Sequence, residues 1–123
     1  MIGLGLDLCG ISRMHILLEK HPEFLNRYFS VQESDYIHDR GACMAESAAA
    51  IFAAKEAYVK ALGTGFLCGI SPKDILVLHE TNGRPYYVIT GAALAKTQEL
   101  GVKSSHLSLT HEGDMAAAVC ILE

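Results

Sequence analysis

The sequence contains no apolar stretch approaching the roughly 20 residues that a membrane-spanning helix needs, although half of its 123 residues are apolar. It also lacks an excess of basic residues, because ten Lys and Arg stand against fourteen Asp and Glu, for a net charge of −4. These shortages exclude a membrane span and argue against a general nucleic-acid-binding surface, which needs clustered cations. Repeats, linkers and low-complexity tracts are absent, so we expect residues 1–123 to form a single domain.

The four cysteines include no C-x-x-C pair, and none lies at zinc-finger spacing from histidines. A structural zinc site is therefore not expected. The N-terminal segment lacks the features of a secretory signal, because no basic region precedes its apolar residues and Asp7 interrupts them. We expect a cytoplasmic protein whose thiols are reduced and buried as small apolar groups.

Hydrophobic periodicity predicts an α+β fold, with a mostly antiparallel sheet packed against a long Ala-rich helix and several shorter helices. The clearest local signals are a capping-box pattern at Ser30–Glu33 and an Asn82-Gly83 turn. The expected strands cover 1–9, 74–80, 85–90, 104–110 and 115–122. The expected helices cover 11–18, 23–29, 30–38, 43–62 and 91–100.

In the first expected strand, leucine and isoleucine alternate with Gly3, Gly5, Asp7 and Cys9. Glycines weaken a strand, so their presence indicates close approach by another backbone or by a ligand. Asp7 is the only charge in this strand and needs a cation, a partner or water. The alternative is that Asp7 simply ends the strand at a solvated edge.

The long helix ends in the run Phe52–Gly65, which reads F-A-A-K-E-A-Y-V-K-A-L-G-T-G. Glu56 and Lys60 are one helical turn apart, in the order that favours a surface ion pair worth roughly 0.3 kcal/mol. The alternative is a ligand site. Asp7 and Glu56 could share a hard cation such as Mg²⁺, while Lys60 and the Gly-Thr-Gly loop accommodate phosphate. No G-x-x-x-x-G-K-[ST] motif is present to strengthen this second interpretation.

His111 follows the expected strand 104–110 at a turn, where a side chain can meet a ligand. A turn histidine without a role is the alternative. The histidines at positions 15, 21, 38 and 79 lie in polar contexts and are interpreted as surface residues.

Four separated stretches follow one another in the order and at the spacing of a single known family, and together they extend over nearly the whole chain. They are Gly3–Leu8, Phe52–Gly65, Gly83–Pro85 and Leu107–His111. Together they resemble the holo-acyl-carrier-protein synthases, the small single-domain 4′-phosphopantetheinyl transferases. The resemblance implies transfer of the phosphopantetheine arm of coenzyme A to a serine of apo acyl carrier protein, in support of fatty acid biosynthesis. Adenosine 3′,5′-bisphosphate is released.

The resemblance also implies roles for individual residues. Mg²⁺ would be held by Asp7 and Glu56, and either Glu56 or a metal-bound water would take the serine proton. Lys60 and His111 would act on the phosphates as catalytic and coenzyme-binding residues. Further coenzyme contacts would come from Gly63, Gly65, Arg84 and Pro85.

The implied partners are the acidic carrier protein and further copies of the chain. Arg13 matches a family arginine on the first helix that meets the carrier, and Arg27 would extend this basic patch, with Lys20 nearby. The family forms homotrimers whose active sites lie between neighbouring subunits, so the same arrangement is expected here.

Two positions depart from the family pattern. Ala50-Ile51 replaces the usual Gly-Arg before the Phe52 run, and Gly10 stands where a glutamate often follows the strand aspartate. The departures put a coenzyme contact and a metal- or water-positioning group in doubt. Two alternatives therefore remain open: a transferase dedicated to a specialised polyketide or lipid carrier, and a non-catalytic coenzyme A-binding module.

Overall fold

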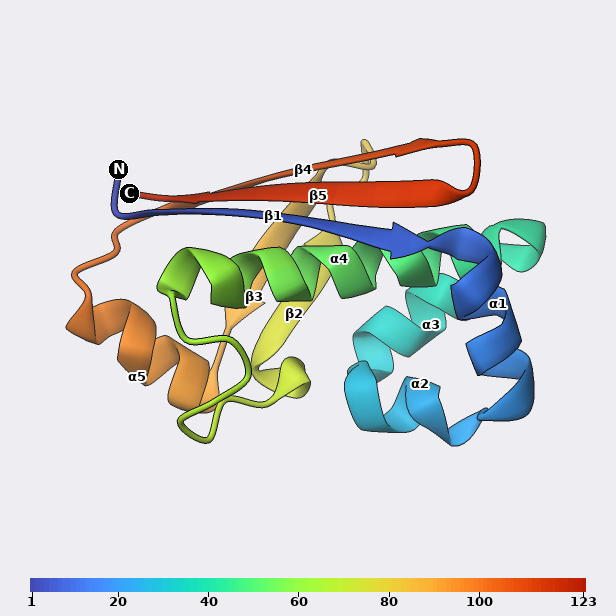
Figure 1. The fold of residues 1–123 in the computed structure, drawn as a ribbon, viewed down its shortest axis with the longest axis horizontal. Helices are drawn as coiled ribbons and strands as arrows, with labels where there is room; N and C mark the ends of the chain where they lie inside the picture. The colour runs from blue at the N-terminus through green and yellow to red at the C-terminus, as the bar shows by residue number, and fades with distance from the viewer.

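A 19-residue helix, α4 (Met44–Leu62), runs through the centre of the molecule in this computed structural model, which describes residues 1–123 (Figure 1). Eleven of its residues are buried, and the other elements pack around it. Its Ala-rich sequence favours the helix. The small alanine side chains also let neighbouring elements pack close to the helix backbone. Gly63, with φ of 79°, ends the helix as the sequence predicts.

The strands form two antiparallel sheets, where the sequence led us to expect one. The larger sheet has the order β1-β5-β4, and β2 pairs only with β3. Strand β3 lies beside β4, but no strand ladder joins them. The bounds are β1 (Gly3–Gly10), β2 (Ile75–His79), β3 (Pro85–Ile89), β4 (Ser105–Glu112) and β5 (Met115–Leu122).

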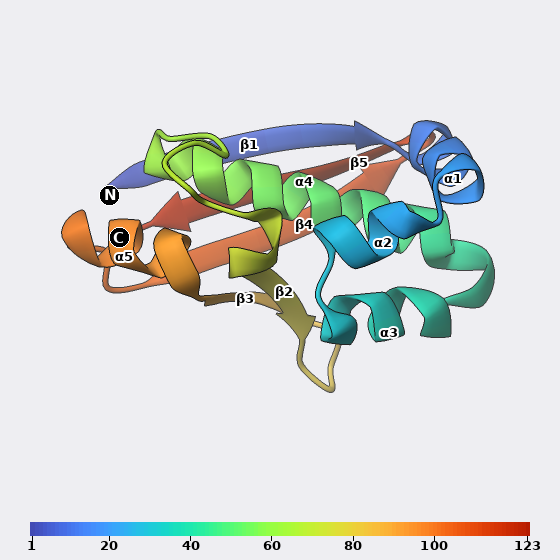
Figure 2. The same cartoon turned by 90° about the horizontal axis from the view of Figure 1, so that it is seen from below.

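Three short helices pack at one end of α4, and a fourth lies near its other end (Figures 1 and 2). The predicted capping box begins the third of them: Ser30 Oγ accepts from the Glu33 amide at 3.1 Å, and Glu33 Oε1 accepts from the Ser30 amide at 2.8 Å. The bounds are α1 (Ile11–Lys20), α2 (Glu23–Tyr28), α3 (Val31–Asp39) and α5 (Gly91–Glu99), with 3₁₀ turns at Gly41–Cys43 and Pro72–Asp74.

A fully buried ion pair anchors α4 to the rest of the fold. Lys55 Nζ lies 2.8 Å from Glu33 Oε1, and both side chains have no exposed area. The ammonium also donates to the carbonyls of Pro72 and Ile75, while Glu33 Oε2 accepts from the Val77 amide. Buried charges persist only when paired and hydrogen-bonded in this way. The network fixes α3, α4 and β2 relative to one another, and it also fixes the position of the residue that follows Lys55.

Strand β1 packs its glycines, not its leucines, against α4. A Cβ at Gly5 would lie 1.8 Å from the Ala57 carbonyl oxygen, so the approach of another backbone that the glycines predict is confirmed. The alternate residues Leu4, Leu6 and Leu8 point outward and are 58%, 62% and 60% exposed. No element of the chain covers this face of the three-stranded sheet (Figure 1). The apolar face of β1 is thus external, contrary to the usual arrangement.

All four cysteines are free, and only Cys9 and Cys120 are buried. The expectation of buried thiols is wrong for Cys43 and Cys68, which lie in exposed turns. None of the helices has the length and hydropathy that crossing a membrane requires.

Candidate active site

Asp7 and Lys60 meet where β1 passes over the last turns of α4. Lys60 Nζ lies 2.8 Å from Asp7 Oδ1 and donates a second hydrogen bond to the Leu6 carbonyl at 3.1 Å. The Asp7 side chain is only 15% exposed, whereas that of Lys60 is 51% exposed. Asp7 therefore lies within the strand facing the helix, not at a solvated strand end, and Lys60 keeps part of its surface open to a ligand.

Glu56 lies beside this pair, one turn earlier on α4. Its Oε1 accepts a hydrogen bond from the Tyr28 hydroxyl at 3.2 Å. Burial raises the pKa of Glu56, and the Asp7 charge raises it further. The hydrogen bond from Tyr28 and the charge of Lys60 act against this rise. Glu56, Asp7 and Lys60 are thus electrostatically coupled in one cluster.

The ion pair between Glu56 and Lys60 that local spacing predicts is not formed. Lys60 pairs instead with Asp7, from a strand more than fifty residues away, and Glu56 pairs with Tyr28 from α2. A pair exposed on a single helix contributes only a few tenths of a kcal/mol. Tertiary partners that are held in place by packing outcompete it.

The donor set of this cluster fits a hard divalent cation. Asp7 Oδ2 and Glu56 Oε2 form no hydrogen bond within the chain, so each carboxylate keeps one oxygen free. No third His, Cys, Asp or Glu joins them to make a protein-only metal cage. Mg²⁺ is commonly bound by one or two carboxylates, with water and phosphate oxygens filling its other positions. Asp7 and Glu56 are therefore the residues that could hold it.

The glycine loop begins next to the cluster. Gly63 and Gly65 both have positive φ, of 79° and 58°. The amides of residues 63–65 donate to the carbonyls of Lys60 and Val59 and so complete the helix cap. The amides of residues 66–69 have no partner within the chain. If this loop binds phosphate through backbone donors, those donors belong to 66–69, further along than the Gly-Thr-Gly motif itself.

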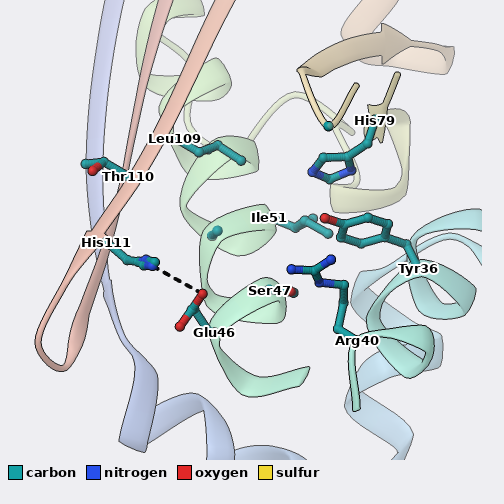
Figure 3. A pocket seen from close by; sticks show the side chains of 11 residues that line it. Tyr36, Arg40, Glu46, Ser47, Ile51, His79, Leu109, Thr110 and His111 are labelled. Carbon is teal, nitrogen blue, oxygen red and sulfur yellow. Dashed lines mark ion pairs between the residues drawn. The ribbon is translucent and has the colours of Figure 1, made fainter. Parts of the chain in front are cut away.

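His111 belongs to a second group of residues, around a cavity of about 440 Å³ (Figure 3). Its Nε2 lies 3.3 Å from Glu46 Oε1. On the opposite side, the Tyr36 and His79 rings stack at 3.9 Å and the Arg40 guanidinium lies over Tyr36. His79 is therefore not a surface histidine, and burial lowers its pKa. His111 itself lies within β4, which continues to Glu112, two residues past the expected strand end at residue 110.

Arg84 and Pro85 lie on the β2–β3 hairpin, which borders this second group. Gly83 of the same turn lines the cavity, and the Arg84 amide donates to Asn82 Oδ1 at 3.0 Å. Ile51 also lines the cavity and is buried, so the departure from the family pattern places an apolar side chain in its wall. Arg40 is the one arginine among the residues that line the cavity.

One chain does not bring the two groups together. Strand β5 separates β1, which carries Asp7, from β4, which carries His111 (Figure 2). Two strand spacings amount to about 10 Å. Both groups use α4, but the group around His111 takes residues 46–51, whereas Glu56 and Lys60 lie nearer the C-terminal end of the helix. Within one chain, the residues assigned to the site from the sequence are therefore divided between opposite edges of the sheet.

The basic residues assigned to a partner lie on α1 and α2. Arg13 and Lys20 lie at a second cavity, of about 320 Å³, whose apolar wall includes Met14, Leu17 and Phe52. Arg27 is exposed in the last turn of α2 and does not line this cavity. Arg13 thus combines a charge with an adjoining apolar surface, whereas Arg27 offers a charge alone.

Sequence reasoning missed three polar residues near these sites. Tyr28 looked like an apolar residue of a helix face, and nothing in its neighbourhood indicates a contact with Glu56. Arg40 lies in a turn between helices, where an isolated charge is ordinary. Glu46 offered a usable signal, because it is the only charged residue in the Ala-rich run 42–54.

The comparisons with known proteins identify the family of this chain. Residues 3–120 match the family model described as the 4′-phosphopantetheinyl transferase superfamily. A holo-[acyl-carrier-protein] synthase of Treponema denticola is 46% identical over 123 residues, which cover all of this chain and 98% of the relative.

Solved structures give the same result. The holo-[acyl-carrier-protein] synthase of Neisseria meningitidis has a TM-score of 0.88 and 32% identity, over all of this chain and 99% of that one. That of Helicobacter pylori, in complex with coenzyme A, has a TM-score of 0.85 and 26% identity, over 98% and 99%. The α+β fold and the resemblance found in the sequence are thereby confirmed: the chain belongs to the 4′-phosphopantetheinyl transferase superfamily.

Proposed function

We propose that the protein transfers the 4′-phosphopantetheine group from coenzyme A to a serine hydroxyl of apo acyl carrier protein, with Mg²⁺. The products are holo carrier protein and adenosine 3′,5′-bisphosphate, and the reaction supports fatty acid biosynthesis. The observation that carries the proposal is the cluster of Asp7, Glu56 and Lys60 at the start of the glycine loop. Two carboxylates and one ammonium beside an open loop suit a pyrophosphate and its cation.

The chemistry follows from the charges in the cluster. The serine oxygen bonds to the β-phosphorus of coenzyme A, and the bond from that phosphorus to the bridging oxygen breaks. The electron pair leaves with adenosine 3′,5′-bisphosphate. Lys60 offsets the negative charge that develops on the phosphoryl oxygens. Mg²⁺, when held by Asp7 and Glu56, supplies further charge stabilisation.

The serine proton passes to Glu56 in this proposal. Glu56 is chosen as the acceptor because its carboxylate lies in the cluster beside Asp7 and Lys60, where the serine hydroxyl would meet the phosphate. The tertiary partners of the cluster matter here, because Lys60 is held by Asp7 and does not neutralise Glu56 directly. The chain's own contribution is therefore to position the reacting groups and to set their charge.

The two halves of the site are joined, in our proposal, by a second copy of the chain. Leu4, Leu6 and Leu8 form an uncovered apolar row on the outer face of β1. Such a row on a polar surface is typical of a contact with another protein. A closed homotrimer would place the β4 edge of one copy, with His111 and the Arg84–Pro85 turn, near the Asp7 cluster of the next.

Mixing two inactive variants tests this shared site. Glu56→Gln and His111→Ala, co-refolded in equal amounts, are expected to regain activity, because about one site in four of a randomly mixed ring combines an intact Glu56 with an intact His111. Each variant alone, treated identically, is the control. A mixture no more active than its two components would contradict a site divided between chains.

The carrier binds, in our proposal, over α1 and α2. Arg13 and Lys20 would meet acidic side chains of the carrier, and the apolar wall of the adjoining cavity would receive an apolar one. Arg27 would add charge at the edge of the contact. Charge complementarity of this kind mainly raises the association rate and the specificity.

A transfer assay with a panel of apo carriers tests the proposed function. We expect a Mg²⁺-dependent mass gain of one phosphopantetheine group on a fatty-acid carrier, and loss of the gain with a chelator. Modification of only a polyketide or specialised lipid carrier would redirect the assignment. Tight coenzyme A binding in calorimetry without transfer to any carrier would contradict catalysis and leave a binding module.

A further inference from the structure

We propose that Tyr28 is a positioning residue of this site, whose hydroxyl holds the Glu56 carboxylate in its cation-binding orientation. The inference rests on the proposed function, because it assigns a purpose to a contact made by one of the proposed metal ligands. It adds a residue from α2 to a site that is otherwise built by β1 and α4.

The Tyr28 ring is held firmly by other aromatic side chains. It stacks on Phe24 at 5.1 Å and on Phe52 at 4.8 Å, with interplanar angles of 20° and 21°. Phe29 and Phe66 pack edgewise against it, with centroids at 5.4 and 6.1 Å. A ring held from several directions cannot rotate freely, so its hydroxyl has a fixed position.

That fixed hydroxyl is the only hydrogen-bond donor that the chain offers to the Glu56 carboxylate. It donates to Oε1 at 3.2 Å and leaves Oε2 unbonded. Glu56 otherwise has a flexible side chain, is only partly buried, and lies near the like charge of Asp7. An outer hydrogen bond that orients a ligating carboxylate commonly contributes 10- to 100-fold in metal affinity or activity.

Tyr28 also connects the carboxylate to the glycine loop. Phe66, which packs against its ring, belongs to the loop that follows Gly65. The loop and Glu56 therefore share one rigid neighbour. This explains why a tyrosine, with both a ring and a hydroxyl, suits the position better than an aliphatic residue would.

The competing explanation is that the hydroxyl is an ordinary polar atom that happens to find an acceptor. The two explanations differ in what a Tyr28→Phe variant does, because this change keeps the ring and its packing and removes only the hydroxyl. A merely structural role would change the melting temperature. A positioning role changes cation affinity and kcat.

The experiment measures Mn²⁺ affinity by calorimetry in the absence of coenzyme A, together with transfer kinetics. For Tyr28→Phe we expect about tenfold weaker Mn²⁺ binding and a similar loss in kcat, with KM for coenzyme A and carrier unchanged. In a Glu56→Gln background, Tyr28→Phe is expected to cause no further loss of affinity. The matched control is Tyr58→Phe, which removes a buried hydroxyl bonded to Thr97.

The outcomes separate the inference from the proposed function. Unchanged Mn²⁺ affinity and kcat in Tyr28→Phe, with an active wild type, would overturn the role of Tyr28 and leave the transferase intact. An equal loss in Tyr58→Phe would also overturn it. A wild type that neither binds Mn²⁺ nor modifies a carrier would contradict the proposed function itself, and the inference would fall with it.

Discussion

The Glu56→Gln variant is expected to transfer phosphopantetheine about a thousandfold more slowly than the wild type, because the change removes both a proposed cation ligand and the proposed base. Asp7 alone would then face the cation. The neutral amide that replaces the carboxylate neither attracts Mg²⁺ as strongly nor accepts the serine proton at neutral pH. The initial rate of carrier modification, measured by mass spectrometry, gives the size of the loss.

The fold of this variant is expected to remain intact. The amide oxygen of glutamine can still accept the Tyr28 hydrogen bond, and removing the charge relieves repulsion with Asp7. The melting temperature should therefore be unchanged or slightly higher. Glu99→Gln is the matched control, because that carboxylate is exposed on α5 and pairs only with Lys96. Transfer by Glu56→Gln at a rate close to that of the control would refute both roles.

Local signals in the sequence predicted local structure well. The Ser30–Glu33 capping box and the glycine at the end of α4 act through neighbouring backbone groups, so the sequence contains everything they need. The Asn82-Gly83 turn is of the same kind. The two-sheet arrangement was missed, because which strands pair depends on how the intervening helix packs, and no short motif encodes that.

The site was predicted in part, for the same physical reason. The residue types at Asp7, Glu56 and Lys60 indicated phosphate and cation chemistry, and the fold brings these three together. The Glu56–Lys60 ion pair, one of the two interpretations of that spacing, does not form, because Lys60 has a tertiary partner that local spacing cannot reveal. Tyr28 was missed because a tyrosine in an aromatic run gives no sign of where its hydroxyl points.

The outward leucines of β1 show what an alternating pattern can and cannot predict. Their alternation predicted a strand correctly, but alternation does not say which face is inside. Here the glycine face is internal because α4 approaches too closely for any side chain at Gly3 or Gly5. The leucines are therefore exposed on the single chain and are available for the proposed contact with a second copy. The position of His111 away from Asp7 follows instead from the strand order β1-β5-β4.

The Gly5→Ala variant is expected to lose about 4 kcal/mol of stability or to fail to fold. A Cβ at this position would lie 1.8 Å from the Ala57 carbonyl oxygen and 2.7 Å from its carbon, both rigid backbone atoms. Neither atom can rotate away, so β1 and α4 must separate. In an open strand, alanine would be favoured over glycine by roughly 0.5–1 kcal/mol. The steric conflict costs several times more than this preference, so the variant is expected to be less stable than the wild type.

Gly10→Ala is the matched control, because it adds the same methyl group to the same strand. Its Cβ would meet only Arg13 Cβ, at an ordinary 3.5 Å, and the backbone there is extended with φ of −69°. Its stability should change by less than about 1 kcal/mol. Urea unfolding of both variants, followed by circular dichroism, measures the difference. Equal midpoints for the two variants would mean that β1 does not rest directly on α4. The approach of Asp7 to Lys60, which depends on that contact, would then have no structural basis.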